Sequence, residues 1–335
     1  MSSLPEVEVL LATYNGERFL REQIDSIIGQ DYENIRVLAR DDGSRDGTVE
    51  ILNEYAQRFP ERFRVMPASA AAGGPKANFL LLMKASTADY ICFSDQDDVW
   101  LPDKVSRSKR AMDQLESRWG RKVPLLVFTD LRLVDDKLKT LHPSFWTYMG
   151  IIPERINRLA QLMVHSVVTG CTAMLNRRLL ELSLRMPDEA YMHDGWVSWL
   201  AAYMGKSRIV KAQTVLYRQH DRNVVGTGAS LDALEVKQPS RSLWEKIRRP
   251  RIAAAHVVRW ELSQRHARAF LKEHGEELSA RKRYQLRAFL RCQTSKSRFI
   301  RVATLITHGF HLVGLKPNLA LMIHLWRMNA DKQAD

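Results

Sequence analysis

The chain has 335 residues, of which 45% are hydrophobic and 27% charged, and it carries a formal net charge of +13. These proportions are typical of a globular protein, and the length allows one large domain or a domain with an appendage. No run of about 18 uncharged apolar residues occurs, so no transmembrane helix is expected. The first residues also lack the basic and apolar regions of a secretory signal.

The three cysteines, Cys92, Cys171 and Cys292, are far apart in the sequence and match no CxxC spacing. Their odd number argues against a disulfide framework, and their spacing argues against a structural zinc site. We therefore expect a protein of the reducing cytoplasm.

The positive charge is concentrated near the C-terminus. Residues 1–240 contain 31 Lys and Arg against 31 Asp and Glu, whereas residues 241–335 contain 20 against 7. Gly, Ser and Pro are frequent between the two parts. The sequence therefore predicts a nearly neutral domain over residues 1–225, a linker over 226–240 and a basic, α-helical region over 241–335.

Apolar runs alternate with amphipathic stretches along the first domain. In chain order, we expect strands at 6–12, 35–39, 63–66, 90–93, 125–128, 167–175, 208–210 and 214–217. The helices expected between them cover 16–30, 48–59, 76–85, 102–119, 154–165 and 194–204, with loops at 70–75 and 130–147. This alternation predicts right-handed βαβ units and an α/β fold, in which helices flank a mostly parallel sheet.

An acidic segment, residues 94–100 (SDQDDVW), directly follows the apolar strand that ends at Phe93. Three carboxylates lie within four positions, where an open α/β sheet presents its strand ends to ligands. Crowded acids repel one another, so a divalent cation is a simple reason to gather them. Asp95 and Asp97 suit magnesium, which takes one or two protein carboxylates. The alternative is a solvated acidic turn.

Two further polar segments follow the first two strands: residues 13–16 (TYNG) and 41–44 (DDGS). In a parallel sheet both lie at the same edge as the acidic segment. A carboxylate there can accept a hydrogen bond from a nucleobase or a ribose hydroxyl, and a tyrosine can stack on a base. Each segment alone is typical of a turn or a helix cap, but the three in order are more specific.

These three motifs, in residues 12–16, 40–48 and 94–100, resemble those of the family 2 glycosyltransferases, which have the GT-A fold. The resemblance covers residues 5–225. The wording of the motifs is most similar to that of bacterial rhamnosyltransferases, which use dTDP-L-rhamnose to build surface polysaccharide.

The resemblance implies roles for individual residues. The nucleotide of a sugar donor would be bound by Thr13, Tyr14, Asn15, Glu17, Asp41, Asp42, Asp95 and Gln96. A divalent metal, Mg²⁺ or Mn²⁺, would be held by Asp97 and Asp95, with His220 as a further ligand. The donor diphosphate or the acceptor would be contacted by Arg218, Arg222, Trp196 and His193.

The resemblance also places an acidic catalytic base before an aromatic-rich helix, usually in a Glu-Asp pair. Here His193 stands in place of the Glu, so Asp194 is the expected base. The alternative is that Asp194 only caps the helix.

The implied reaction is an inverting transfer of one or a few sugars to a glycan or a lipid-linked glycan, of the O-antigen or capsule type. A QxxRW motif of processive members is absent from the sequence. The alternatives are a UDP-Gal, UDP-Glc or UDP-GlcNAc donor, or a non-catalytic protein that binds nucleotide sugars or serves as a membrane scaffold.

Apolar residues in the basic region alternate with Lys and Arg: Trp244, Ile247, Val257, Trp260, Leu262, Phe270, Phe289, Phe299 and Leu305. Such helices suit an anionic membrane surface. They are also compatible with packing on the first domain or with formation of a homo-oligomer. No nucleic-acid motif is found, so no nucleic-acid partner is expected. We expect a cytoplasmic enzyme, peripheral at the inner face of the membrane.

Overall fold

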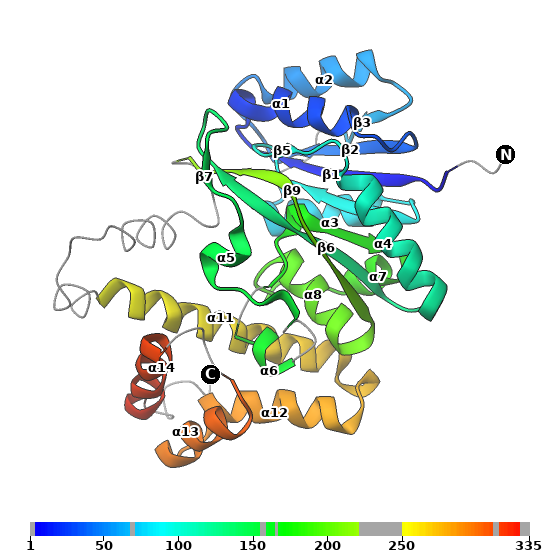
Figure 1. Cartoon of the computed structure of the whole chain (residues 1–335). Coiled ribbons are helices and arrows are strands. Elements are labelled where there is room, and N and C mark those ends of the chain that lie inside the picture. The colour runs from blue at the N-terminus through cyan, green and yellow to red at the C-terminus, as the bar shows by residue number, and fades with distance from the viewer. Residues whose placement is uncertain are drawn as a thin grey trace. The chain divides into compact units, whose positions relative to one another are not determined.

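The computed structural model describes residues 4–67, 71–154, 159–164, 167–220, 250–310 and 315–328 (Figure 1). The chain divides into two compact units, the first formed by residues 1–157 and 167–218 and the second by 158–166 and 219–335. The predicted linker over residues 226–240 lies outside the described residues, as does Arg222.

The first unit contains all the described strands. They are β1 (Val7–Thr13), β2 (Ile35–Asp41), β3 (Phe63–Val65), β4 (Tyr90–Ser94), β5 (Val99–Trp100), β6 (Leu125–Val134), β7 (Thr140–His142), β8 (Ala173–Asn176) and β9 (Lys206–Arg218). Its helices are α1 (Glu17–Ile28), α2 (Thr48–Arg58), α3 (Pro75–Ala85), α4 (Lys104–Trp119), α5 (Phe145–Met149), α7 (Arg177–Ser183) and α8 (His193–Met204). A short 3₁₀ turn, Gly170–Thr172, precedes β8.

The nine described strands form one sheet in the order β3-β2-β1-β4-β8-β6-β9-β5, with β7 paired to β6. Six of these strands (β1, β2, β3, β4, β6 and β9) run in one direction, and β5, β7 and β8 run in the other. The predicted α/β fold with a mostly parallel sheet and flanking helices is therefore confirmed.

Strand β1 lies between β2 and β4, and its register fixes the edge at which the three strands end. Thr13 pairs with Asp41 of β2, and Leu11 pairs with Ser94 of β4. The chain segments that leave these strands therefore start from the same edge of the sheet, as expected for parallel neighbours.

The core of the first unit is built on central strands that are apolar on both faces. In β4, for example, all five residues are buried. This pattern arises because helices cover both sides of a parallel sheet. Helix α3 packs on β1 and β2, while α4 packs on β6 and β9 (Figure 1).

Strand β6 extends to Val134, into a segment that was predicted to be a loop over residues 130–147. In the sequence, the charged residue Asp130 interrupts the apolar pattern of this strand. In the structure it is buried in the sheet and only 2% exposed. Its carboxylate accepts hydrogen bonds from Ser144 Oγ (2.6 Å) and Gln213 Nε2 (3.0 Å). Because its hydrogen-bonding capacity is used, the acid is tolerated in the strand.

Other elements also differ from the prediction, and β5, β7 and α5 were not predicted. The two strands expected at 208–210 and 214–217 are one strand, β9, whose pairing with β6 shifts register beside Asp130. The strand expected at 167–175 is replaced by the 3₁₀ turn and β8. Helix α7 was not predicted, although Asn176 caps it by accepting a hydrogen bond from Leu179 N at 3.1 Å.

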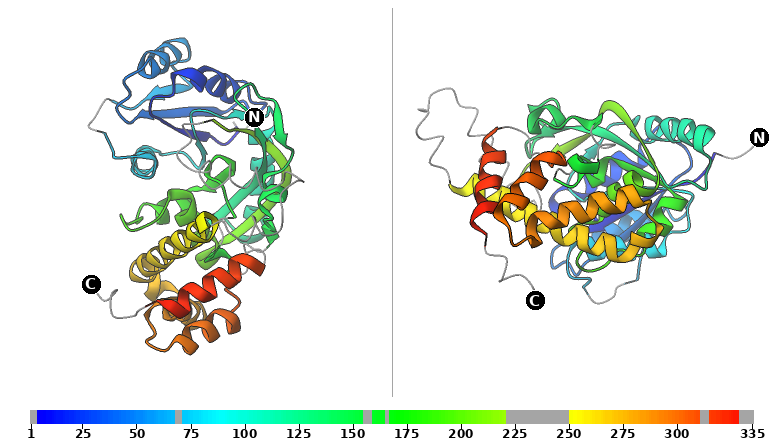
Figure 2. Two further views of the ribbon diagram at one scale, coloured as in Figure 1. Left: turned by 90° about the vertical axis from the view of Figure 1, so that its left-hand side faces the viewer. Right: turned by 90° about the horizontal axis from the view of Figure 1, so that it is seen from below.

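The second unit is helical in its described residues. It contains α6 (Leu159–Leu162), α11 (Pro250–His274), a 3₁₀ turn (Gly275–Glu277), α12 (Ala280–Thr294), α13 (Arg298–Thr307) and α14 (Leu315–Arg327). Helices α11 to α14 pack on one another, as the yellow to red ribbons of Figure 2 show. None of the helices in the part of the chain that the structure describes combines the length and the low charge that a membrane span requires.

Of the apolar residues predicted on the basic helices, most of those whose side chains the structure describes lie inside this unit. Trp260, Phe270, Phe289 and Leu305 are at most 2% exposed, whereas Phe299 is 74% exposed. Trp244 and Ile247 lie outside the described residues, as does the side chain of Val257. The alternation of apolar and basic residues therefore reflects mainly packing between these helices.

Replacement of Gly205 by alanine tests a close approach between two chain segments. A Cβ atom at Gly205, between α8 and β9, would lie 1.9 Å from the Pro124 carbonyl oxygen. We expect Gly205→Ala to lower the free energy of unfolding by about 1–3 kcal/mol, because a backbone atom would have to move. Gly29→Ala is the control, since its nearest neighbour would be 3.1 Å away. Equal denaturant midpoints for both variants would contradict this expectation.

Candidate functional site

The ends of β1 and β2 are joined by direct hydrogen bonds between the first two predicted motifs. Thr13 Oγ1 donates to Asp41 Oδ1 at 2.9 Å, and Asp42 N donates to the Thr13 carbonyl oxygen at 2.9 Å. The Asp41 carboxylate also accepts from Gly43 N (2.9 Å) and Ser44 N (2.7 Å). These donors hold the carboxylate of Asp41 in one orientation at the sheet edge.

Asp42 has a different environment, although it is the next residue. It is 6% exposed and is paired with the buried Arg40, whose Nη1 lies 3.1 Å from Asp42 Oδ1. Its carboxylate also accepts hydrogen bonds from Gly74 N (2.9 Å) and Ala72 N. In this structure Asp42 therefore fixes the segment before α3 to the end of β2.

The first and second motifs are further connected through Asn15 and Glu17. Asn15 has a left-handed backbone (φ 49°), and its side-chain oxygen accepts from Arg45 N at 2.8 Å. Glu17 Oε2 accepts from Gly47 N at 3.0 Å. Both residues predicted to bind donor thus hold the two loops together in this structure.

The first motif is connected to the acidic segment through Gln96. Its side-chain oxygen accepts from Tyr14 N at 2.7 Å, and its Nε2 donates to the Tyr14 carbonyl oxygen at 2.9 Å. The Tyr14 side chain is 54% exposed. The backbone of Tyr14 is therefore held by both bonds, while its ring stays open to a stacking ligand.

The acidic segment brings several carboxylates together. The pKa of Asp95 is raised to about 7, first by burial and then by the negative charges of Asp97 and Asp194. The pKa of Asp98, which is 1% exposed, is also raised, by burial and by the charges of Asp97 and Asp95. The mutual repulsion predicted from the sequence is therefore present in the structure.

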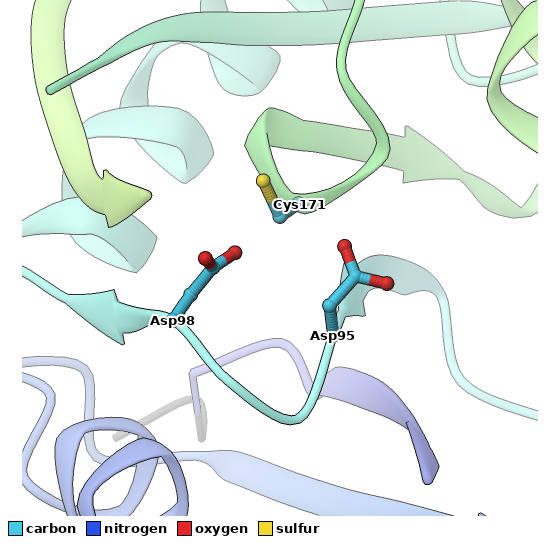
Figure 3. Close-up of side chains that lie close together, drawn as sticks. All are labelled: Asp95, Asp98 and Cys171. Carbon is cyan, nitrogen blue, oxygen red and sulfur yellow. The ribbon is translucent and has the colours of Figure 1, made fainter. Parts of the chain in front are cut away.

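A cluster with the ligand types of a metal site is formed by Asp95, Asp98 and Cys171. One ligand atom of each lies within 4.8 Å of the others, and Figure 3 shows the three side chains close together. Asp98 Oδ2 is buried and has no hydrogen-bond partner among the described residues. Carboxylate oxygens suit Mg²⁺ or Mn²⁺ better than the thiol does. A hard divalent cation therefore fits the acids here.

Sequence reasoning named Asp95 but missed Asp98 and Cys171 as its neighbours. Cys171 is 76 positions beyond Asp95 and belongs to the 3₁₀ turn before β8, so no local motif joins them. Asp98 lay inside the quoted motif, and its burial was the missing information. Lys104 was also missed; it is fully buried beside the ring of Trp100, with Nζ 4.1 Å from the ring centroid.

The predicted base, Asp194, is in the first turn of α8, whose N-cap residue is Met192. Its carboxylate accepts hydrogen bonds from Gly170 N at 3.2 Å and from Gly195 N at 2.7 Å. Because the charge of Asp194 raises the pKa of Asp95, the structure brings Asp194 near the acidic segment. The two backbone donors hold the carboxylate of Asp194 in one orientation.

The neighbouring candidates His193 and Trp196 are buried. His193 is 4% exposed, and its ring centroid lies 4.0 Å from that of Phe79 and 4.7 Å from that of Phe93. Burial lowers the pKa of His193 to about 4. Trp196 is fully buried. In this structure both side chains belong to the core rather than to a surface open to diphosphate or acceptor.

Arg218, predicted to contact diphosphate, is 1% exposed at the end of β9. Its guanidinium donates to the carbonyl oxygens of Asp97 (2.8 Å) and Asp136 (2.5 Å) and pairs with Glu22 Oε2 at 2.6 Å. Its backbone N also donates to Asp98 Oδ1 at 3.2 Å. Through its contacts with Asp97 and Asp98, Arg218 therefore stabilises the acidic segment.

His220 follows two residues beyond β9 and belongs to the second unit. Its predicted role as a metal ligand stays a prediction.

The fold is similar to that of a solved structure. TarS 1-349 of S. aureus, solved in complex with UDP-GlcNAc, matches with a TM-score of 0.57 and 14% identity, over 98% of this chain and 91% of that one. The sequence profile described as "Glycosyl transferase family 2" matches residues 8–182. The chain therefore belongs to the family 2 glycosyltransferases.

Relatives in sequence agree with this assignment. The chain is 30% identical over 234 residues to the dTDP-rhamnosyl transferase RfbG of Shigella flexneri, covering 67% of this chain and 76% of that protein. It is also 24% identical over 250 residues to an uncharacterised glycosyltransferase of Rickettsia typhi, covering 72% of this chain and 70% of that one.

Replacement of Arg218 tests whether it supports the fold or binds a ligand. We expect Arg218→Ala to lower the free energy of unfolding by about 3 kcal/mol, because buried carbonyl groups lose their donors. Arg21→Ala is the control, since Arg21 pairs with Glu54 at the surface with 50% of its side chain exposed, and such pairs contribute about 0–1 kcal/mol. Unchanged stability of Arg218→Ala in urea titrations would contradict the supporting role.

His193 predicts a pH dependence of stability. An unfolded histidine takes up a proton near pH 6.5, whereas the folded one resists it until about pH 4. The contribution of His193 to the free energy of unfolding is therefore complete above pH 6.5. It is lost as the pH falls toward 4, by up to about 1.4 kcal/mol per pH unit. His193→Gln should flatten the free energy of unfolding between pH 7 and pH 5, unlike His142→Gln at the partly exposed end of β7. Parallel curves for wild type and His193→Gln would refute this.

Proposed function

We propose that this protein transfers L-rhamnose from dTDP-L-rhamnose to a hydroxyl group of a glycan or a lipid-linked glycan. The proposal is carried by one observation: the three predicted motifs meet at the same edge of the sheet, joined by the hydrogen bonds of Asp41 and Gln96 and by the pairing of β1 with β4. The relationship to RfbG supports rhamnose as the sugar. Family membership supports sugar transfer itself.

The proposed donor site uses the exposed parts of this edge. The ring of Tyr14 stacks on the nucleobase, and the carboxylate of Asp41 accepts hydrogen bonds from the nucleoside. Thr13, Asn15 and Glu17 keep the two loops in place for that contact. The acids of residues 95–98 hold Mg²⁺ or Mn²⁺, with Asp95 and Asp97 as its ligands. When bound, the metal neutralises negative charge on the departing diphosphate.

The proposed chemistry is a single displacement with inversion at the anomeric carbon. Asp194 accepts the proton of the acceptor hydroxyl while that oxygen bonds to the anomeric carbon. The bond from this carbon to the diphosphate oxygen breaks on the opposite side, and the nucleoside diphosphate leaves with the electron pair. The bonds from Gly170 N and Gly195 N hold the carboxylate of Asp194 in position for the transfer.

A second donor has a specific observation in its favour. The similar structure of TarS was solved with UDP-GlcNAc, so a UDP-linked sugar is the competing proposal for this site. The pathway we propose for either donor is the assembly of bacterial surface polysaccharide, of the O-antigen or capsule type.

Replacement of the proposed base tests the mechanism. Asp194→Asn should leave donor affinity within about twofold and lower turnover by about 10²–10⁴-fold, the usual contribution of a general base. Donor binding is measured by calorimetry and turnover by release of nucleoside diphosphate. Asp188→Asn, on the exposed loop before α8, is the matched control. Equal turnover for the two variants would remove Asp194 from the mechanism, and inactive wild type with normal donor binding would favour a non-catalytic protein.

A thermal-shift panel of nucleotide sugars tests the donor. We expect dTDP-L-rhamnose with Mn²⁺ to raise the melting temperature most, because a ligand that binds only the folded state stabilises it by mass action. Asp97→Ala should remove most of the metal-dependent part of the shift, while Asp113→Ala, on the exposed side of α4, should not. A larger shift with UDP-GlcNAc would select the competing donor.

A further inference from the structure

The second unit exposes an apolar face on two neighbouring helices. On α13 the exposed apolar residues are Phe299 (74%), Ile300 (51%) and Ile306 (49%), and on α14 they are Leu319 (48%), Ile323 (52%) and Trp326 (40%). On α14 the residues recur at intervals of four and three positions, and on α13 Phe299 and Ile306 are seven positions apart with Ile300 beside Phe299, so each set occupies one side of its helix. We call these six residues the α13–α14 face.

The two helices form one surface rather than two separate ones. The rings of Phe299 and Trp326 meet edge to face, with centroids 5.0 Å apart. The opposite sides of the helices are buried, with Leu305 and Leu325 fully covered, and the buried Arg301 donates to the Met328 carbonyl oxygen at 2.7 Å. The helices are therefore fixed to the unit by one side, while the other presents apolar groups outward.

This surface lies in a strongly basic part of the chain. Residues 278–330 contain ten Lys and Arg and no Asp or Glu. Lys296, Arg298 and Arg327 are exposed beside the residues of the face. Contiguous exposed apolar groups mark an interaction site, and the charge around them selects an anionic partner.

We propose that the α13–α14 face binds the surface of an anionic lipid membrane. Phe, Trp, Leu and Ile side chains enter the boundary between headgroups and acyl chains, and the neighbouring cations pair with lipid phosphates. No helix among the described residues is suited to cross the bilayer, so the attachment is interfacial. This inference goes beyond the proposed sugar transfer and does not depend on the donor.

The charge distribution disfavours a second copy of this chain as the occupant. A two-fold interface would place the same cationic patch of each copy against the other, and like charges at such short range are repulsive. A lipid surface supplies anionic groups and apolar chains together, which matches both properties of the face.

The test is flotation of the full chain with lipid vesicles. We expect binding to vesicles in which about a third of the lipid is phosphatidylglycerol, and little binding to phosphatidylcholine alone. The triple variant Lys296→Gln, Arg298→Gln, Arg327→Gln should weaken the partition coefficient by about a hundredfold, since each lost cation accounts for about fivefold.

The apolar contribution is tested with two tryptophans of nearly equal exposure. Trp326→Ser, combined with Phe299→Ser, should weaken the partition coefficient at least tenfold. Trp119→Ser, at the end of α4 in the first unit, should leave it unchanged, although Trp119 is 41% exposed against 40% for Trp326. Circular dichroism and thermal unfolding establish that each variant is folded.

Three outcomes would overturn the proposal. They are equal binding to neutral and anionic vesicles, equal loss in the Trp119→Ser control, and a dimer in light scattering that the Phe299→Ser, Trp326→Ser variant dissociates. If the double variant unfolds, Ile323→Ser alone gives the same test with a smaller change in the core. The variants designed to weaken vesicle binding should keep their turnover on a soluble acceptor analogue. This measurement distinguishes failure of the present inference from failure of the proposed function.

Discussion

The site depends on how the fold holds four acids, Asp95, Asp97, Asp98 and Asp194, close together. Burial, together with the negative charges of Asp97 and Asp194, raises the pKa of Asp95 to about 7, and carboxylates held this close together repel one another. The acidic segment is restrained by Arg218, which donates to the backbone of Asp97 and through its own backbone to Asp98. Its guanidinium donates to the peptide carbonyl oxygen of Asp97 within this segment.

The position of Arg218 is itself a product of sheet topology. It is the last residue of β9, a strand that pairs in parallel with β6 and in antiparallel with β5, which forms the end of the acidic segment. The bulge beside Asp130 sets the register of β9. The acids of one loop are therefore controlled by a strand more than a hundred positions later in the chain.

The sequence was sufficient for the fold class and for the convergence of the three motifs, because parallel strands and their ends follow from local patterns. The sequence was insufficient where a polar or charged residue is buried in the structure rather than exposed in a loop or at a binding surface. Asp130 was predicted to lie in a loop but is buried in β6. Arg218 was predicted to contact the diphosphate but is buried at the end of β9. His193 is likewise a neutral core residue between aromatic rings. In each case the deciding partner is distant in the sequence, so no window of neighbouring residues contains it.

The double hydrogen bond between Gln96 and the backbone of Tyr14 has a consequence for ligand recognition. When a loop becomes ordered only on binding a ligand, its loss of conformational entropy lowers the affinity for that ligand. Here hydrogen bonds within the chain fasten two strand-end loops to each other. Selectivity among incoming molecules then rests on the shape of a preorganised surface rather than on which of them can drive a loop to fold.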